Sequence, residues 1–346
     1  MRPLHLVVPG SLDQRTGGYL YDKRIVEGLR AQGREVVVHE LAGDFPLVDT
    51  VAREAARAAA DRFAGGVAVI DGLALPALHD RIDQVPAPWV ALVHHPLAME
   101  TGLAPDEVEA LAAIERHVLR YPARVIVTSR QTVEDLAAFD VAQERIGVVL
   151  PGTDPAPLAS GSEGPGVALL CVASLTPRKG HLVLLQALAE LVDLDWHLNC
   201  VGSADRDPDT AAQIRNAIED LGLRERVTLA GEQDEAGLVP YYDGADVFVL
   251  ASYHEGYGMA LAEALARGLP IISTNAGAIP GTVPSDAGIL VDPGDKAVLT
   301  EALGRIITER PLRNRLAAGA RTERDRLPSW DDASRQFAEQ LDQVVG

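Results

Sequence analysis

The amino-acid sequence repeats one pattern of elements twice. Short runs of apolar and β-branched residues alternate with longer stretches of helical character, which is typical of a parallel sheet covered by helices on both faces. The first half contains predicted strands at 4–8, 35–39, 67–70, 89–93, 124–127 and 147–150, and predicted helices at 19–32, 49–64, 105–120 and 131–139. The second half contains predicted strands at 167–172, 197–201, 227–229, 247–250, 271–273 and 289–291, with helices that include 181–192, 209–221 and 260–267. We therefore expect two doubly wound α/β domains.

A stretch rich in proline and glycine separates the two halves. Residues 151–157 read Pro-Gly-Thr-Asp-Pro-Ala-Pro, and residues 160–166 read Ser-Gly-Ser-Glu-Gly-Pro-Gly. Because proline and glycine at this density interrupt helices and strands, we expect a linker at 151–166 between an N-terminal domain at 1–150 and a C-terminal domain at 167–328. The length of 346 residues also suits two hydrophobic cores better than one.

Charge and hydropathy restrict the partners of the chain. Its 50 acidic and 31 basic residues give a formal net charge of −19, which disfavours binding to nucleic acid or to an anionic membrane. No apolar run approaches the roughly 20 residues of a membrane-spanning helix, and residues 1–8 are too short a run for a secretory signal. We therefore expect a cytoplasmic protein. The two cysteines, Cys171 and Cys200, lie in strand-like runs without metal-ligand spacing, so we expect buried thiols.

The segment 253–270 carries the strongest functional pattern. A predicted strand enters it, a glycine-spaced loop follows, and a helix is predicted to begin near Met259. Glycines let a ligand approach the backbone, and the free N–H groups of a helix start favour an anion such as a diphosphate. Glu255 would lie in the loop and Glu263 about one turn into the helix, where both carboxylates would accept hydrogen bonds from sugar or ribose hydroxyls. The alternative is an ordinary strand-to-helix turn with two solvated glutamates.

This segment resembles the E-x7-E signature of retaining GT-B glycosyltransferases of the family-4 type, the glycosyl transferases group 1. Other motifs follow in the family's order over nearly the whole chain. The resemblance implies two Rossmann-like domains facing across a cleft that holds a nucleotide diphosphate sugar. It further implies that Glu255 contacts the donor sugar and that Glu263 binds the ribose. The residues implied to line the sugar and the diphosphate are Gly256, Tyr257, Gly258 and Met259.

A second pattern follows the first predicted strand of the C-terminal domain. Lys179 is one of only three lysines in the chain, and a compact ammonium at a strand end suits a diphosphate leaving group. The loop resembles the family's Gly-Arg-Leu…Lys-Gly pattern, except that Ser174 stands where the family has arginine. Arg178 is then the candidate for the second cation. An isolated lysine in such a turn would otherwise be a surface residue.

The N-terminal domain offers weaker candidates at its predicted strand ends. Gly17 and Gly18 resemble the family's glycine-rich loop that closes on the donor phosphates, although a Gly-Gly pair alone is an ordinary turn. Family members place a histidine near the anomeric carbon and the acceptor, and His94 matches that register better than His95. With an ordinary pKa near 6.5, either ring could bond a sugar hydroxyl or assist the acceptor. Further candidates for acceptor contact are Asp71 and Ser129, of which Ser129 is also a possible helix cap.

The remaining motifs refine the expected site. Glu232 and Gln233 follow a predicted strand where the family receives the nucleotide base. Residues 205–207 imitate a D-x-D metal motif, but we interpret them as a solvated turn before a helix, so we expect neither a metal nor a cofactor. A dinucleotide-binding Gly-x-Gly-x-x-Gly is absent after every predicted strand. In the resembled family a helix beginning near Ser329 crosses back to the N-terminal domain, so that domain is expected to include about 329–346.

The leading hypothesis is a retaining hexosyltransferase that moves a sugar from a nucleotide diphosphate sugar to an acceptor hydroxyl. A UDP-sugar is favoured and a GDP-sugar is possible. A soluble acceptor is preferred, because the predicted helix at 49–64 mixes arginines with acidic residues and is not a basic amphipathic helix. Two alternatives keep the fold: a nucleotide-sugar epimerase or phosphorylase, for which additional acid/base or phosphate-binding groups are lacking, and a non-catalytic sugar-nucleotide-binding protein, which Ser174 favours.

Overall fold

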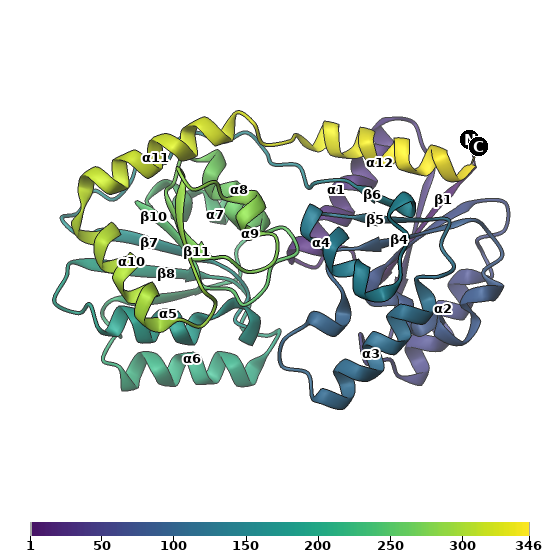
Figure 1. Cartoon of the computed structure of the whole chain (residues 1–346), viewed down its shortest axis with the longest axis horizontal. Helices are drawn as coiled ribbons and strands as arrows, with labels where there is room; N and C mark the ends of the chain where they lie inside the picture. Colours follow the sequence, from purple (N-terminus) through teal and green to yellow (C-terminus); the bar gives the residue numbers. More distant parts are fainter. Residues whose placement is uncertain (1, 346) are drawn as a thin grey trace. The chain divides into compact units, whose positions relative to one another are not determined.

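The computed structural model describes residues 2–345 and divides into two compact units (Figure 1). The N-terminal unit comprises Met1–Gly152 together with Pro328–Gly346, and the C-terminal unit comprises Thr153–Leu327. The prediction of two doubly wound α/β domains is confirmed, because the described residues form two parallel six-stranded sheets flanked by helices.

The sheet of the N-terminal unit has the strand order β2-β1-β3-β4-β5-β6, with every neighbouring pair parallel. Its strands are β1 (Leu4–Pro9), β2 (Val36–Leu41), β3 (Val67–Asp71), β4 (Trp89–Val93), β5 (Arg124–Val127) and β6 (Ile146–Val148). They lie where the apolar runs predicted them, because strands buried on both faces are apolar at nearly every position. The strand order reverses between β1 and β3.

Five α-helices of the N-terminal unit are α1 (Gly17–Ala31), α2 (Thr50–Ala60), α3 (Pro105–Val118), α4 (Arg130–Asp135) and α12 (Trp330–Val345). Short 3-10 segments are η1 (Gly72–Gln84), η2 (Leu97–Met99), η3 (Leu136–Phe139) and η4 (Gln143–Arg145). The predicted helix at 131–139 is thus an α-helix that ends as η3. The segment η1 had not been predicted; it contains Pro76 and begins where the Asp71 carboxylate accepts the N–H of Leu73 at 2.8 Å.

Helix α12 packs against α1 within this unit, and it is drawn in yellow in Figure 1. The contact is close enough that a Cβ on Gly28 would overlap the side chain of Ser334. Ala333, Phe337 and Leu341 of α12 are buried. The last helix of the chain therefore forms part of the core of the unit that the first residues begin.

The sheet of the C-terminal unit has the order β12-β11-β10-β7-β8-β9, and all its pairs are parallel as well. Its strands are β7 (Val167–Val172), β8 (Trp196–Val201), β9 (Val227–Gly231), β10 (Val247–Leu250), β11 (Ile271–Thr274) and β12 (Gly288–Val291). Its helices are η5 (Pro177–Lys179), α5 (His181–Ala189), α6 (Pro208–Asp220), α7 (Glu235–Asp243), α8 (Met259–Ala266), α9 (Ile279–Thr282), α10 (Lys296–Thr308) and α11 (Arg310–Arg324). Here the strand order reverses between β7 and β10.

Much of the predicted linker at 151–166 is fixed to the C-terminal unit. The backbone N–H of Ser160 donates to Asp243 Oδ1 at 3.1 Å, and that of Ser162 donates to Asp246 Oδ1 at 3.2 Å. Proline and glycine interrupt regular structure here, but aspartates at the start of β10 and the end of α7 still bond the backbone. The segment has no regular secondary structure, but hydrogen bonds attach it to the C-terminal unit.

Cys171 and Cys200 are both buried and face each other across the β7–β8 register, as thiols rather than a disulfide. Within residues 2–345, no helix combines the length and the apolar character needed to cross a membrane.

Candidate active site

The reversal of strand order in the C-terminal unit brings two predicted loops together. Because β7 and β10 are parallel neighbours, the loops that leave their carboxyl ends start side by side. Ligands of doubly wound sheets bind at such a reversal, outside the carboxyl ends of the strands. Lys179 lies in the loop after β7, and Glu255 lies in the loop after β10.

Glu255 is the centre of a buried ionic cluster. Its Oε1 lies 2.6 Å from Lys179 Nζ, and its Oε2 lies 3.6 Å from Arg178 Nη1. The hydroxyl of Ser252, which is fully buried, donates to the same Oε1 at 2.6 Å. The Glu255 side chain is only 7% exposed, so its charge is stabilised by these three groups rather than by water.

The charge state of Glu255 follows from this cluster. Burial by itself raises the pKa of the carboxyl, but Lys179, Arg178 and the hydrogen bonds of the cluster outweigh burial and lower the pKa to about 2. Glu255 is therefore ionised at every pH at which the protein would work. Counting these three side chains alone, two cations face one carboxylate, an excess of positive charge that suits a phosphate-bearing ligand.

Backbone contacts fix the geometry of the two loops. The N–H of Tyr253 donates to the carbonyl of Arg178 at 2.8 Å, and the N–H of Ala278 donates to the carbonyl of Glu255 at 2.8 Å. Gly277 has a φ of +56° and packs so closely on Glu255 that a Cβ there would overlap its backbone. The loop after β11 thus supports the loop that carries Glu255.

Arg178, the candidate for the second cation, lies beside Glu255. Its Nη1 donates to the carbonyl of His254 at 2.9 Å and faces Glu255, so the second cation comes from the residue beside Lys179. Ser174 is half-buried and its carbonyl accepts the N–H of Thr176 at 2.9 Å. A departure from the family pattern at one position is therefore matched by a cation at another.

Glu263 lies on α8, and its carboxylate forms a hydrogen bond with a residue of α7. Its Oε2 accepts the hydroxyl of Tyr242 at 2.8 Å, and burial raises the pKa of its carboxyl. It does not belong to the ionic cluster around Glu255. Its role toward a ribose remains a prediction.

The glycine-spaced loop leads into α8 as predicted. Gly258 takes the left-handed conformation, with a φ of +87°, and Met259 is the first residue of the helix. Gly256 and Tyr257 precede this turn; burial raises the pKa of the Tyr257 phenol to about 12, so it stays protonated. The left-handed glycine is what lets the chain turn directly from the loop into the helix.

The predicted base-binding residues lie further along the sheet. Glu232 is exposed and Gln233 bonds the carbonyl of Ala230 at 2.9 Å, both just after β9. β9 is an edge strand, and β8 lies between it and β7. Their contact with a base remains a prediction. In the segment 205–207, Asp207 caps α6 by accepting the N–H of Thr210 at 2.9 Å, as expected of a turn before a helix.

The N-terminal unit has its own buried cluster at the carboxyl ends of its strands. His94 follows β4, and its Nε2 lies 3.1 Å from Asp22 Oδ1 and 3.4 Å from Asp71 Oδ2. Asp71 comes from the end of β3, and Asp22 comes from α1, one turn after Gly18. Gly18 packs on the ring, because a Cβ there would lie 3.3 Å from His94 Cδ2. Asp22 had not been predicted.

The protonation of this cluster is strongly perturbed. Burial lowers the pKa of His94, but the two carboxylates outweigh it and raise the pKa to about 10. Burial raises the pKa of Asp22 to about 6; His94 opposes this rise and Asp71 adds to it. The surroundings of His94 therefore raise its pKa above the ordinary value of 6.5 that was assumed from the sequence.

The other N-terminal candidates have structural partners. Ser129 is buried and caps α4, where its Oγ accepts the N–H of Thr132 at 3.1 Å. The Nε2 of His95 lies 3.1 Å from Glu100 Oε2. Gly17 opens α1. The contact of these residues with an acceptor or a donor phosphate remains a prediction.

The ligand atoms of Asp22, Asp71 and His94 lie within 4.8 Å of one another, a spacing at which a cation could also be held. However, Nε2 contacts both carboxylate oxygens directly, so the three groups already satisfy one another as hydrogen-bonded ion pairs. We do not assign them as metal ligands.

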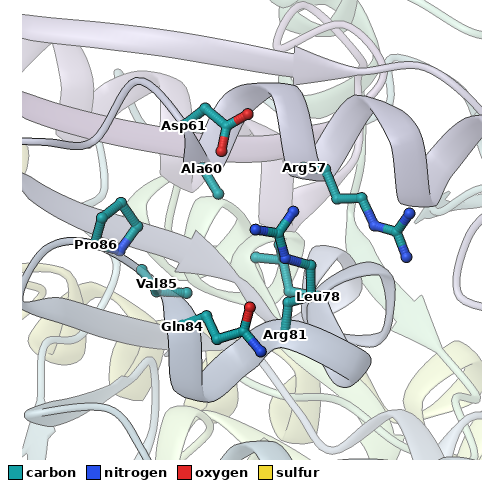
Figure 2. Close-up of a pocket in the computed structure, with 8 residues that line it drawn as sticks. All are labelled: Arg57, Ala60, Asp61, Leu78, Arg81, Gln84, Val85 and Pro86. Carbon is teal, nitrogen blue, oxygen red and sulfur yellow. The ribbon is translucent and has the colours of Figure 1, made fainter.

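A separate cavity of about 220 Å³ lies in the N-terminal unit (Figure 2). Figure 2 shows its lining residues, Arg57, Ala60, Asp61, Leu78, Arg81, Gln84, Val85 and Pro86. They come from the end of α2 and the end of η1, each of which precedes a strand. The cavity therefore lies at the amino ends of the strands, opposite the edge that carries His94.

Two parallel doubly wound sheets with polar clusters at their strand ends define the GT-B fold. Sucrose-phosphate synthase from Thermosynechococcus elongatus superimposes with a TM-score of 0.86 at 22% identity, covering 100% of this chain and 99% of that one. HepE of Anabaena, solved in complex with UDP and glucose, has a TM-score of 0.77 at 17% identity, covering 99% and 100%. These similarities establish the fold.

Sequence comparison identifies the family. The model of the family described as "Glycosyl transferases group 1" matches residues 159–323. The MMP alpha-(1->4)-mannosyltransferase of Mycolicibacterium hassiacum is 30% identical over 314 residues, covering 84% of this chain and 74% of that protein. The D-inositol 3-phosphate glycosyltransferase of Xylanimonas cellulosilytica is 30% identical over 270 residues, covering 71% of this chain and 64% of that protein. The chain belongs to the glycosyl transferases group 1, as its motifs predicted, although it spans less than two thirds of the length of that second relative.

Proposed function

We propose that the chain is a retaining glycosyltransferase that moves a sugar from a nucleotide diphosphate sugar to an acceptor hydroxyl, without a metal or a cofactor. The observation that carries this proposal is the cluster of Lys179, Arg178 and Glu255 at the reversal of strand order in the C-terminal unit. A net positive site beside a carboxylate suits a ligand that joins a diphosphate to a sugar rich in hydroxyls.

The cations and the carboxylate of the cluster have different roles in the proposed reaction. Lys179 and Arg178 stabilise the negative charge that develops on the diphosphate as the bond to the sugar breaks. The start of α8, just after the left-handed Gly258, adds backbone N–H groups for the same oxygens. Glu255 accepts hydrogen bonds from sugar hydroxyls and so orients the ring.

Retention is what the family resemblance implies, and Glu255 is not suited to achieve it by double displacement. Its carboxylate is held by two cations and a hydroxyl, which makes it a poor nucleophile toward the anomeric carbon. In a same-face attack, the acceptor oxygen bonds to the anomeric carbon while the bond to the diphosphate breaks. The acceptor proton passes to the departing phosphate oxygen, so no protein base is required.

A UDP-sugar is the favoured donor and a GDP-sugar the second choice. HepE, a fold neighbour, was solved with UDP and glucose. For the acceptor we propose a soluble hydroxyl compound. Several relatives are named D-inositol 3-phosphate glycosyltransferases, so D-inositol 3-phosphate is the first compound to test.

The test is transfer of radiolabelled sugar from UDP- and GDP-sugars in the presence of a chelator, with the anomeric configuration of the product read by NMR. Glu255→Gln should abolish transfer, whereas Glu219→Gln, on an exposed glutamate paired with Arg224, is the matched control. Normal turnover by Glu255→Gln, an inverted product or loss of activity with chelator would each contradict the corresponding part of the proposal. Calorimetric binding of a nucleotide sugar without turnover would instead indicate the non-catalytic binding protein.

A further inference from the structure

One ring nitrogen of His94, Nε2, contacts two carboxylates. Nε2 lies 3.1 Å from Asp22 Oδ1 and 3.4 Å from Asp71 Oδ2; because ionised carboxylates only accept hydrogen bonds, Nε2 beside two of them carries the hydrogen and donates it. That leaves Nδ1 as the ring atom that meets a ligand. Among the described residues Nδ1 has no hydrogen-bond partner, and the side chain is 19% exposed.

Among the described residues, His94 is the one cationic side chain that contacts the two carboxylates. The Asp22 and Asp71 side chains are only 2% and 5% exposed. Two buried carboxylates this close repel each other, and each is costly to bury without a counter-charge. Gly18 packs on the imidazole, and the ring of Tyr21 meets it edge-on with the ring centroids 5.3 Å apart. A neutral His94 would leave two adjacent buried anions without a cationic contact from the described part of the chain.

We propose that Asp22 and Asp71 hold His94 as an imidazolium at neutral pH, with Asp22 as a positioning residue that the family motifs do not include. His94 then presents Nδ1–H as a charged hydrogen-bond donor and cannot accept a proton from the acceptor hydroxyl. Its part in sugar transfer rests on the proposed function, whereas its charge state does not.

The titration behaviour of the neighbours agrees with this arrangement. The two carboxylates raise the pKa of His94 to about 10 against the effect of burial. Burial keeps the pKa of the Tyr21 phenol well above its usual range, and its hydroxyl donates to the carbonyl of Val149 at 3.1 Å. Tyr21 is therefore neutral, and the charges facing the imidazole are those of Asp22 from α1 and Asp71 from β3.

The cluster also selects among ligands. Two carboxylates and one imidazolium sum to a net charge of −1, so a phosphate approaching Nδ1 is repelled by the carboxylates behind the ring. A neutral hydroxyl accepts the Nδ1–H bond without that repulsion. The N-terminal cluster therefore favours a hydroxyl oxygen, in contrast to the net positive cluster around Glu255.

The charge state is tested by NMR on the intact, ligand-free protein labelled with ¹⁵N at histidine. The His94 signals are assigned by their loss in His94→Gln. We expect both ring nitrogens to remain protonated up to at least about pH 8, and Asp22→Asn to lower the titration midpoint by at least about one pH unit. Asp140→Asn, at an exposed left-handed residue where asparagine is well tolerated, should leave the midpoint unchanged.

A wild-type midpoint near 6.5, or a midpoint that Asp22→Asn does not move, would overturn the inference. The wild-type titration needs no variant, so a variant that fails to fold does not block the test. The NMR titration needs no substrate. It therefore tests the charge state of His94 even if the proposed sugar transfer is not observed. Where transfer is observed, the alkaline limb of kcat/KM should move to lower pH in Asp22→Asn by the same amount as the NMR midpoint.

Discussion

Replacing Lys179 by methionine should uncouple the ionic cluster of the C-terminal unit. Methionine keeps the length of the side chain but removes the ammonium that lies 2.6 Å from Glu255. The folded protein holds the pKa of Glu255 at about 2, against an ordinary value of 4.5. At about 1.4 kcal/mol per unit, that difference is about 3 kcal/mol in favour of the folded state.

The sign of the effect follows from the depressed pKa. The stabilisation is fully present above pH 4.5, where the unfolded chain also ionises Glu255, and it is lost as the pH falls through about 2. Lys179 is the strongest of the groups that lower this pKa. Because Arg178 and Ser252 contribute too, we expect Lys179→Met to reduce the free energy of unfolding at pH 7 by about 1–3 kcal/mol, with Lys179→Arg restoring part of it.

A double-mutant cycle with Glu255→Gln isolates this term from other effects of the substitution. Unfolding of the C-terminal unit can be followed by Trp196 alone, in a background where Trp89 and Trp330 are replaced by phenylalanine. The coupling energy between positions 179 and 255 should be about 1–3 kcal/mol. A coupling energy near zero would refute the reasoning, because the ion pair would then make no net contribution. In the transfer assay, Lys179→Met should lower kcat about 100- to 1000-fold, the usual effect of losing one group that stabilises a developing negative charge.

Three further predictions concern single contacts. Ser252→Ala removes a buried hydrogen bond to the Glu255 carboxylate. It should lower kcat/KM about 10- to 100-fold, the loss expected for one charge-assisted hydrogen bond. An unchanged kcat/KM would show that this hydrogen bond is dispensable. Gly28→Ala should destabilise the N-terminal unit in urea titration by about 1–3 kcal/mol despite alanine's higher helix propensity, because its Cβ would overlap Ser334; a gain in stability would contradict this. His5 and His39 share a buried hydrogen bond of 2.9 Å, and burial lowers the pKa of both, so their contribution is intact above pH 6.5 and lost as the pH falls below it. The urea midpoint should therefore fall less between pH 7.5 and 5.5 in His39→Gln than in the wild type, and equal slopes would exclude this source.

The strands and the Lys179–Glu255 cluster could be predicted from the sequence for a physical reason. Strands buried on both faces are continuous apolar runs, and in a doubly wound sheet the functional groups follow the carboxyl ends of those runs. Both residues lie a few positions after a run. Their ion pair depends only on β7 and β10 being neighbours, which the strand order of this fold supplies.

Asp22 and Ser252 could not be found in the same way. Asp22 is an ordinary helical aspartate in the sequence, and its partner His94 is 72 residues away. Their contact depends on the rotation of α1 about its axis and on the order of β1, β3 and β4, neither of which local periodicity encodes. Ser252 looks like any small residue at a strand end, and only its distance to Glu255 distinguishes it. Conversely, the hydroxyl of Ser129 matched the pattern of a site residue and is used as a helix cap.

The N-terminal unit is assembled from both ends of the described chain, since Pro328–Gly346 belongs with Met1–Gly152. During synthesis on the ribosome, the second unit can therefore complete its core while the first still lacks the helix that covers α1. Of the two units, the one whose strands come first in the sequence is the last to close. Until α12 emerges, the face of α1 that it packs against stays uncovered, and exposed apolar surface of this kind favours aggregation.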